Sequence, residues 1–528
     1  MIARRAPGLI LALFILMIAA APVLGGEPET VTFAIEEYEV TGNTLMSASV
    51  IRRTLAGFTG PEETADTVEA ARSALEKLYH KKGYPTVMVN IPEQTVEGGT
   101  VILSVMESTV DRVYVKDNKW FSASGILAKL PALSPGTVLY LPDIQRDLAK
   151  VNRSRYVKVT PALMPGTRPG TVDVELTVDD DPPLRGSLEL SNRASHDTTD
   201  WRLNAEVGYE NLWQKEHSVS FQYQTSPQDL SEVQVIAASY MLPAPWNARH
   251  LVIGYGVWSD SETAFGEGFQ VIGEGMIFGG RVMMPLASVG GYSHHMTLGA
   301  DYKDFNQSLA FDDDEEGVET PVTYLPLSLS YSSSFGGKGA RTSLFAGLNA
   351  GLRGLVADNE EFREKRFRGR ANFLYMTLGV EHERKVPPGL GIFSKLDGQL
   401  SDQPLISNEQ YAAGGLNSVR GYKESEVLGD DAVHGTFELT AYGLTEGLLP
   451  LEEPSWSPVL FYDFCATRLR DPLPGQEEFD YINGAGLGFA ARWGDMLETE
   501  LAWAVALSTV NRTESGANRF HIRLKWKF

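Results

Sequence analysis

The chain has 528 residues, a net charge of -22 and one cysteine, Cys465. This length favours several domains, the acidic balance argues against nucleic acid as a partner, and a single cysteine excludes an intrachain disulfide. The 51 glycines, the 10% aromatic content and the lack of a long apolar run after the N-terminus together fit a transmembrane β-barrel, whose strands alternate between two faces.

The N-terminus has the pattern of a secretory signal. Arg4 and Arg5 precede an apolar run over residues 9–20, and small residues follow it. This order predicts a signal peptide over residues 1–25. The alternative is a membrane anchor helix, but the run is short for a bilayer, which needs about 20 residues.

Residues 27–181 contain two units with the same order of patterns. Each unit has a strand, two helices and two further strands, and the units cover residues 27–108 and 109–181. In the first unit, strands are expected at 33–40, 87–91 and 100–106, and helices at 47–55 and 67–82. In the second, strands are expected at 110–115, 157–159 and 172–178, and helices at 121–130 and 142–152. Two α+β domains are therefore predicted.

From residue 182 to residue 528, short alternating segments are separated by turns. We expect about sixteen antiparallel strands, one of them centred near residue 271. An even number returns both ends of a barrel to the same side, and closure leaves no unpaired edge in lipid. The predicted fold is thus an all-β transmembrane barrel preceded by two α+β domains.

The final segment alternates strictly. Phe520, Trp526 and Phe528 share one face with two aliphatic residues, while basic residues and His521 occupy the other. This pattern predicts a strand with one face toward lipid. The alternative is an amphipathic edge strand of a soluble sheet.

The stretch Val419-Arg420-Gly421-Tyr422 follows a glycine-rich turn between two predicted strands. An arginine there has little local structure to hold it, and a planar guanidinium suits a carboxylate. Asp463 lies about forty residues later on a predicted strand. The alternative is a surface arginine with no fixed partner.

Several motifs in this order resemble the outer-membrane transporters of two-partner secretion systems, the haemolysin-activator and adhesin-exporter family. The motifs of the first domain are Gly42-Asn43-Thr44-Leu45, Gly83-Tyr84-Pro85 and Ile91-Pro92-Glu93-Gln94, and Gly429-Asp430 belongs to the barrel. The alternative interpretation is that the N-terminal units are two generic α+β domains.

The resemblance implies a sixteen-stranded barrel in the outer membrane of a Gram-negative-type cell, in contact with its lipid, and two POTRA domains in the periplasm. It also implies a large secreted partner exported unfolded, with no cofactor, metal or catalytic residue. Within the barrel it implies that the segment 419–422 folds into the lumen, where Arg420 pairs with Asp463. The terminal Phe528 would then be part of the signal read by the barrel assembly machinery during biogenesis.

The POTRA domains are expected to bind the unfolded client. An exposed sheet edge can add an extended strand with little demand on sequence, and Val87, Val89 and Ile91 are the candidate edge residues. The alternative is that these domains are only spacers.

The sequence therefore predicts a protein transporter for a secreted haemolysin-like or adhesin-like partner. The alternative is a barrel assembly or insertion factor of the same superfamily, although such factors commonly carry more POTRA repeats. A small-solute porin needs neither POTRA domains nor the arginine loop. An enzyme is not expected because no catalytic constellation or phosphate-binding motif is found.

Overall fold

The computed structural model describes residues 31–261, 263–266, 269–272, 274–309, 318–387, 389–442 and 454–528. It divides into two compact units, Met1–Asp181 and Pro182–Phe528. The predicted signal peptide lies outside the described residues. Within the described ranges, no helix is long and apolar enough to cross a membrane.

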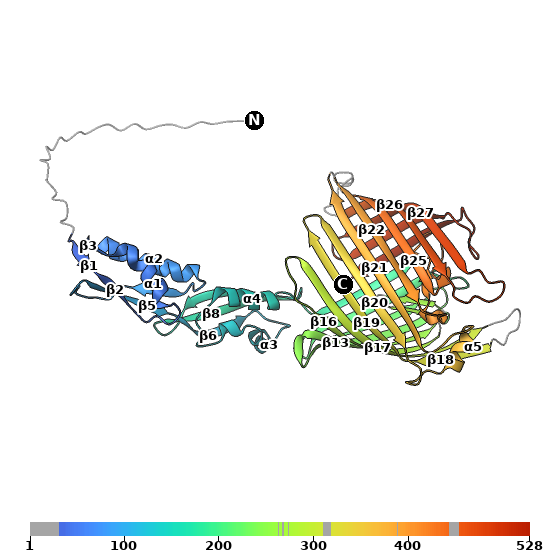
Figure 1. The fold of residues 1–528 in the computed structure, drawn as a ribbon, viewed down its shortest axis with the longest axis horizontal. Coiled ribbons are helices and arrows are strands. Elements are labelled where there is room, and N and C mark those ends of the chain that lie inside the picture. Colours follow the sequence, from blue (N-terminus) through green and yellow to red (C-terminus); the bar gives the residue numbers. More distant parts are fainter. Residues whose placement is uncertain are drawn as a thin grey trace, which may run out of the picture. The chain divides into compact units, whose positions relative to one another are not determined.

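The first domain of the N-terminal unit packs two helices on one face of a three-stranded sheet (Figure 1). Strand β5 is central, with β2 parallel to it on one side and β4 antiparallel on the other. Alternate strand residues such as Val101 and Leu103 are buried under the helices. The elements are β1 (Phe33–Ile35), β2 (Glu37–Thr41), α1 (Ala48–Leu55), β3 (Gly60–Glu63), α2 (Ala65–Lys81), β4 (Val87–Asn90) and β5 (Thr100–Glu107).

The second domain repeats this arrangement, with sheet order β6-β8-β7. Its elements are β6 (Thr109–Lys116), α3 (Ala123–Ala128), α4 (Leu141–Val151), β7 (Val157–Pro165) and β8 (Thr171–Asp180). Only Ser108 separates β5 from β6, and it is 2% exposed. The domains also touch directly, because Leu141 N donates to Gly83 O at 2.8 Å and the Tyr84 and Tyr140 rings lie 5.1 Å apart.

The second unit is a closed antiparallel barrel (Figure 1). Strands β18 and β19 are separated by one residue and pair with successive parts of β17, so they make one crossing. The barrel therefore has sixteen crossings, as predicted. They are β9 (Leu184–Ser191), β10 (Arg202–Leu212), β11 (His217–Thr225), β12 (Gln234–Ala244), β13 (Asn247–Asp260), β16 (Gly275–Pro285), β17 (Tyr292–Leu309), β18 (Val318–Tyr324) with β19 (Pro326–Gly337), β20 (Ala340–Gly351), β21 (Phe373–Val386), β22 (Leu390–Ser401), β25 (Asp431–Ala441), β26 (Pro454–Arg468), β27 (Phe479–Trp493), β28 (Leu497–Ala506) and β29 (Asn518–Lys527).

One expected strand is misplaced. The segment centred near residue 271 forms β15 (Phe269–Ile272), which pairs with β14 (Thr263–Gly266) in a separate hairpin. The barrel crossing is β16, which begins at Gly275. Glycines at 275, 279 and 280 weaken the strand pattern of β16, whereas β15 ends with the β-branched pair Val271-Ile272, which favours a strand.

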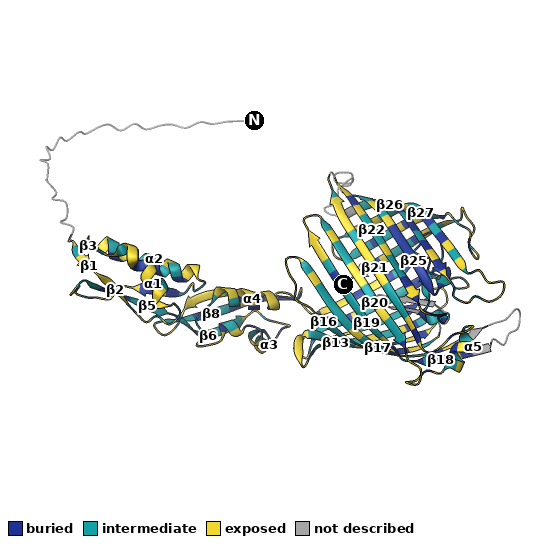
Figure 2. Ribbon diagram, in the orientation of Figure 1, coloured by how far each residue is buried: buried dark blue, intermediate teal, exposed yellow. Residues whose placement is uncertain are grey.

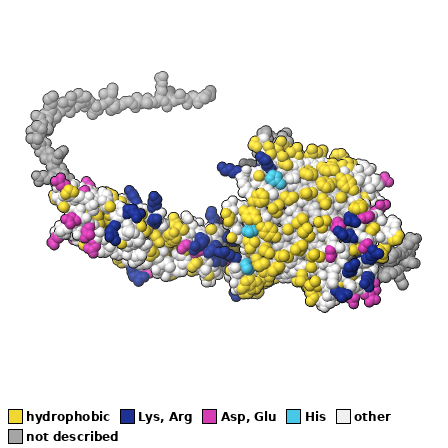
Figure 3. Space-filling model, viewed as in Figure 1, with side chains coloured by type: hydrophobic (Ala, Val, Ile, Leu, Met, Phe, Trp, Pro, Cys, Tyr) yellow, Lys and Arg dark blue, Asp and Glu magenta, His cyan; other side chains and the backbone are white. Residues whose placement is uncertain are grey.

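The barrel wall alternates as a membrane barrel must. Along the strands, more exposed residues alternate with less exposed ones (Figure 2). Hydrophobic side chains cover the outer face in view, and charged side chains gather toward the end that carries β18 and the short helix α5 (Asn359–Lys365) (Figure 3). An apolar outer surface with charged side chains gathered toward one end fits a barrel that lies in a lipid bilayer.

The two ends of the barrel differ. We call the end where β9 begins and β29 ends the terminal rim, and the opposite end the loop rim. Turns at the terminal rim can be as short as two residues, as between β19 and β20. The loop rim carries the segment 352–372, which contains α5, and the segment 402–430 between β22 and β25, which we call the lumen loop.

The barrel closes between its first and last strands. Strands β29 and β9 pair over five residues, from Arg523↔Ser191 to Lys527↔Ser187, and the backbone groups of Phe528 and Gly186 extend this pairing. Asn192 extends this seam with its side chain, because its Oδ1 accepts from Ile522 N at 2.8 Å and its Nδ2 donates to Phe520 O at 2.6 Å.

Candidate functional site

The lumen loop folds back into the barrel and is locked to the wall through Arg420. The Arg420 Nε and Nη2 atoms donate to the two Asp463 carboxylate oxygens at 2.6 and 2.8 Å. Nη1 donates to Glu438 Oε1 at 2.7 Å. The guanidinium also lies over the Phe461 ring, 3.6 Å from its centroid. Arg420 and Asp463 are 5% and 0% exposed, so this bidentate pair is almost fully removed from solvent.

The neighbours of Arg420 are held just as closely. Val419 and Tyr422 are both 0% exposed, and the Tyr422 hydroxyl donates to Ser508 O at 2.8 Å. Gly421 has φ +104°, and a Cβ there would lie 3.0 Å from Ala506 N. Its own N–H donates to His521 Nε2 at 3.1 Å. A side chain at this position would therefore be strained and would collide with β28.

The sequence singled out Arg420 and Asp463, and the structure brings them together. It also shows participants that the sequence analysis missed. A Cβ at Gly484 on β27 would lie 1.9 Å from Arg420 O, so only glycine lets the loop approach this strand. Glu438 and His521 also contact the motif. Gly484 stands in the run Asn483-Gly484-Ala485-Gly486 of small residues, which is the one pattern that could have indicated close backbone approach.

Two further carboxylates tie the lumen loop to the connection between β9 and β10. Glu424 Oε1 accepts from Arg193 Nε at 2.9 Å, and Glu426 Oε2 contacts His196 Nε2 at 2.8 Å. Both glutamates are at most 5% exposed. The loop is therefore anchored beside the first strand as well as at β26.

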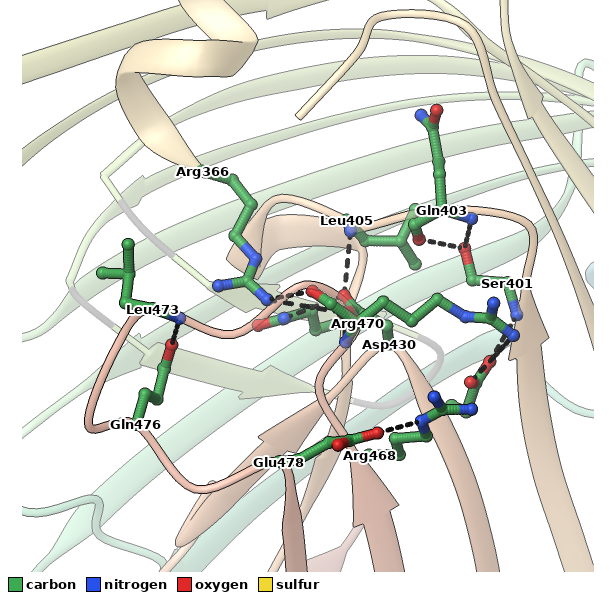
Figure 4. A network of polar contacts seen from close by, with 12 residues as sticks. Arg366, Ser401, Gln403, Leu405, Asp430, Arg468, Arg470, Leu473, Gln476 and Glu478 are labelled. Atoms are coloured by element: carbon green, nitrogen blue, oxygen red, sulfur yellow. Dashed lines mark hydrogen bonds and ion pairs between the residues drawn. The ribbon is translucent and has the colours of Figure 1, made fainter. Parts of the chain in front are cut away.

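Asp430 is the hub of a third anchor at the loop rim (Figure 4). Its carboxylate accepts from Leu405 N at 2.8 Å and from Arg470 N at 2.7 Å, and Arg366 lies 3.5 Å away. Asp430 is 0% exposed. It joins three segments that are distant in sequence: the lumen loop, the segment that carries α5, and the connection between β26 and β27.

Glu409 forms a fourth anchor on the other side of the lumen. Its Oε1 accepts from Lys303 Nζ at 2.5 Å and from the Tyr324 hydroxyl at 2.6 Å. Its Oε2 accepts from the Tyr375 hydroxyl at 2.7 Å. These partners come from β17, β18 and β21, and Glu409 is 4% exposed. No sequence pattern indicated Glu409, because its partners meet only in the closed barrel.

Toward the terminal rim the lumen is hollow and polar. One cavity of about 490 Å3 is lined by serines together with His295, Glu381 and Lys395. Another of about 560 Å3 is lined by residues that include Gln222, Arg281 and Asp301. Hydroxyl, amide and paired charged groups keep such a space hydrated.

The edge of the candidate client-binding strand β4 is less accessible than the exposed edge that we expected. Of the three predicted residues, Val87 and Val89 are 0% and 1% exposed, and only Ile91, which directly follows β4, reaches the surface at 39%. The outer edge of β4 is already occupied by side chains of α2. Arg72 Nη1 donates to Val89 O at 3.1 Å, Glu76 Oε2 accepts from Val89 N at 3.1 Å, and His80 Nε2 lies 3.0 Å from Val87 O.

The last strand carries its aromatic residues outward. Phe520, Trp526 and Phe528 are 66%, 48% and 61% exposed, while His521 on the opposite face is buried. Phe528 pairs with Gly186 through both backbone groups at 3.0 Å, so the chain end is part of the seam.

Two pKa shifts in the N-terminal unit follow from burial. Burial raises the pKa of Tyr79 to about 12, and its hydroxyl donates to Asn43 Oδ1 at 2.6 Å. Burial also opposes ionisation of Asp147, but hydrogen bonds from Lys150 and from Ala132 N outweigh it and lower the pKa of that carboxyl. Among the described residues, no group of three or more His, Cys, Asp or Glu side chains could hold a metal ion.

A sixteen-stranded barrel with an infolded arginine loop, preceded by paired α+β domains, defines a class of outer-membrane barrels with periplasmic POTRA domains. The chain belongs to the haemolysin secretion/activation protein family ShlB/FhaC/HecB, which it matches over residues 170–491. Residues 33–108 match the ShlB-type POTRA domain. POTRA domains of this family lie in the periplasm, so the terminal rim faces the periplasm and the loop rim faces the exterior.

The chain is also similar to a relative in sequence and to two solved structures in fold. The chain is 23% identical over 428 residues to the outer membrane transporter CdiB of Dickeya dadantii, covering 77% of this chain and 72% of the relative. The structure of CdiB from Escherichia coli is similar with a TM-score of 0.61 at 20% identity, covering 97% and 93% of the two chains. BamA from Haemophilus ducreyi, lacking POTRA domains 1–3, has a similar fold with a TM-score of 0.56 at 13% identity, covering 94% and 100%.

Proposed function

We propose that this protein binds an unfolded secreted partner with its POTRA domains and passes it through the barrel lumen to the cell surface. The observation that carries the proposal is the lumen loop. Its bidentate Arg420–Asp463 pair is 5% and 0% exposed and stands beside a hollow polar lumen. A loop held by a few discrete anchors can leave the lumen without unfolding the wall.

The proposed client is an extended polypeptide of a haemolysin-like or adhesin-like exoprotein. A client strand that added to β4 at Val87 and Val89 would first have to displace Arg72, Glu76 and His80. Client binding at β4 is therefore coupled to movement of these side chains, and Ile91 is the exposed contact beside them.

The assembly machinery would insert the barrel itself into the membrane, and it would recognise the exposed aromatic residues of β29.

The test is secretion of a candidate partner, chosen as a large exoprotein from the same gene neighbourhood. The partner would be co-expressed with the wild type, with Arg420→Ala and with Arg512→Ala, and quantified in the medium at matched barrel levels. Arg512 is a suitable control because its ion pair with Asp197 is mostly exposed. We expect strong export with the wild type and the control, and loss of export with Arg420→Ala.

Equal export by all three proteins would remove the role of the loop while keeping the transporter. If the wild type exports nothing and its depletion lowers outer-membrane proteins in general, the protein is an assembly factor instead.

A further inference from the structure

An apolar cluster fills the loop rim on the side of the lumen opposite Arg420. Phe362 of α5, Ala371 that follows it, and Leu405 and Ile406 of the lumen loop are each at most 1% exposed. They pack together with inward-facing residues of the wall. The wall residues of this cluster include Val235, Val257, Ile277, Phe305, Val322 and Phe373.

This cluster borders one of the two lumen cavities. Val257 and Ile277 belong to the cluster and also line the cavity of about 560 Å3. The rest of that lining includes the charged side chains of Arg281, Asp301 and Lys303. A hydrated space therefore stops at a patch of buried apolar side chains, where ions would lose their hydration without gaining any ligand.

Specific polar contacts hold the two segments that supply the cluster. In the α5 segment, Glu361 Oε2 accepts from Thr323 N at 2.9 Å and Lys365 Nζ donates to Thr320 O at 3.0 Å. In the lumen loop, the Glu409 carboxylate binds Lys303 and the hydroxyls of Tyr324 and Tyr375. Glu409 lies only three residues after Ile406, so its position fixes Leu405 and Ile406 against the wall.

We propose that the cluster is a plug that closes the outer mouth of the lumen when no client is present, and that Glu409 is the positioning residue that holds it. This plug is a second closure, separate from the Arg420–Asp463 lock. The lumen loop spans from Glu409 on the β17–β21 side to Arg420 on the β25–β26 side, so opening the pore requires release at both ends. The inference concerns the resting pore and does not depend on which client the protein carries.

The experiment is single-channel conductance of the purified full-length protein in planar bilayers without any partner. The variants are Glu409→Gln, which removes the charge that binds Lys303, and Phe362→Ala, which removes the largest side chain that the two inserted segments contribute to the plug. Glu206→Gln is the matched control, because Glu206 faces the lumen and pairs with Arg185 at 3.2 Å but takes no part in the cluster. Folding of each variant is checked by its gel mobility before and after heating.

We expect open events to be several-fold more frequent in Glu409→Gln and Phe362→Ala than in the wild type or Glu206→Gln. The double variant Lys303→Glu with Glu409→Lys restores the ion pair in reverse, and it should return the conductance toward the wild-type level. A channel that is merely destabilised would not be rescued in this way.

Two outcomes would overturn the proposal. One is a wild-type protein that conducts continuously. The other is wild-type conductance from folded Glu409→Gln and Phe362→Ala, with Arg420→Ala alone opening the pore. The second outcome would leave the proposed transport function intact, because secretion of the partner is measured separately.

Discussion

The side-chain amide of Asn152 hydrogen-bonds to both backbone groups of Val159. Its Oδ1 accepts from Val159 N at 2.7 Å, and its Nδ2 donates to Val159 O at 3.0 Å. Asn152 directly follows α4, and Val159 lies in the edge strand β7. The second domain thus covers its edge strand from the end of its second helix, much as α2 covers β4 in the first domain. Such contacts blunt an edge that could otherwise pair with any extended chain.

Removing Glu76 should open the edge of β4. Without its carboxylate, Val89 N loses its acceptor, and a hydrogen bond to a charged group contributes about 1.5–3 kcal/mol. We expect the Val89 amide of Glu76→Ala to exchange with solvent at least about tenfold faster, as measured by hydrogen exchange. Glu69→Ala is the control, since Glu69 pairs with the same Arg72 without touching β4, and its Val89 amide should exchange at the wild-type rate.

Replacing Asp463 with asparagine should destabilise the infolded loop. The buried Arg420 guanidinium would lose its bidentate carboxylate, at a cost of up to about 3–5 kcal/mol when a buried pair is broken. Glu438, which is partly exposed, can offset only part of it. We expect faster proteolysis within the lumen loop of Asp463→Asn. Asp471→Asn, which breaks an exposed pair with Arg368, should be cleaved no faster than the wild type.

Asp147 should make the stability of the second domain depend on pH. Its pKa is lowered in the folded chain because hydrogen bonds from Lys150 and Ala132 N outweigh the effect of burial. A lowered pKa stabilises the fold above the unfolded value of about 3.9, and this contribution is lost as the pH falls through that value toward the folded pKa. The urea midpoint of the N-terminal unit in the full chain should therefore drop on acidification.

The same titration with Asp147→Asn identifies the source of the pH dependence. The variant should be less stable than the wild type at pH 7 by about 1–3 kcal/mol, and the difference should shrink toward pH 3. A constant difference across the range would show that Asp147 does not titrate as proposed.

Phe528→Ala should lower the yield of folded barrel in the outer membrane. The Phe528 ring covers Gly186 at the seam, where a Cβ would lie 2.2 Å from it, and the side chain is 61% exposed on the lipid face. The measurement is the heat-modifiable fraction in outer-membrane extracts. Phe437→Ala removes an equally apolar outward side chain from β25, and an equal loss in that control would argue against a special role for the chain end.

Much of the architecture could be predicted because period-two patterns and turns repeat through the barrel. The number of crossings and the partners Arg420 and Asp463 were both expected from the sequence. Helix α5 was not expected: its segment reads as a polar loop, and Phe362 is its only buried residue. The helix forms because Asp358 caps it and because its side chains bond to β18, which lies far away in sequence.

The limits of the sequence are clearest at Glu409 and at β4. Glu409 has three partners on three strands, and their meeting depends on barrel closure rather than on local spacing. For β4, alternation correctly indicated a strand over residues 87–91. It carried no information about the outer backbone groups, which are occupied by residues one helix away.

The junction at Ser108 makes the N-terminal unit mechanically stiff. A single buried residue joins β5 to β6, Leu141 hydrogen-bonds to Gly83, and the Tyr84 ring contacts the Tyr140 ring. These three links hold the two domains in a fixed arrangement. A force applied to the first domain would therefore rotate both domains together rather than separate them. Asp181, Pro182 and Pro183 are the only residues between β8 and β9, so the chain passes from the second domain to the first strand of the barrel seam within three residues.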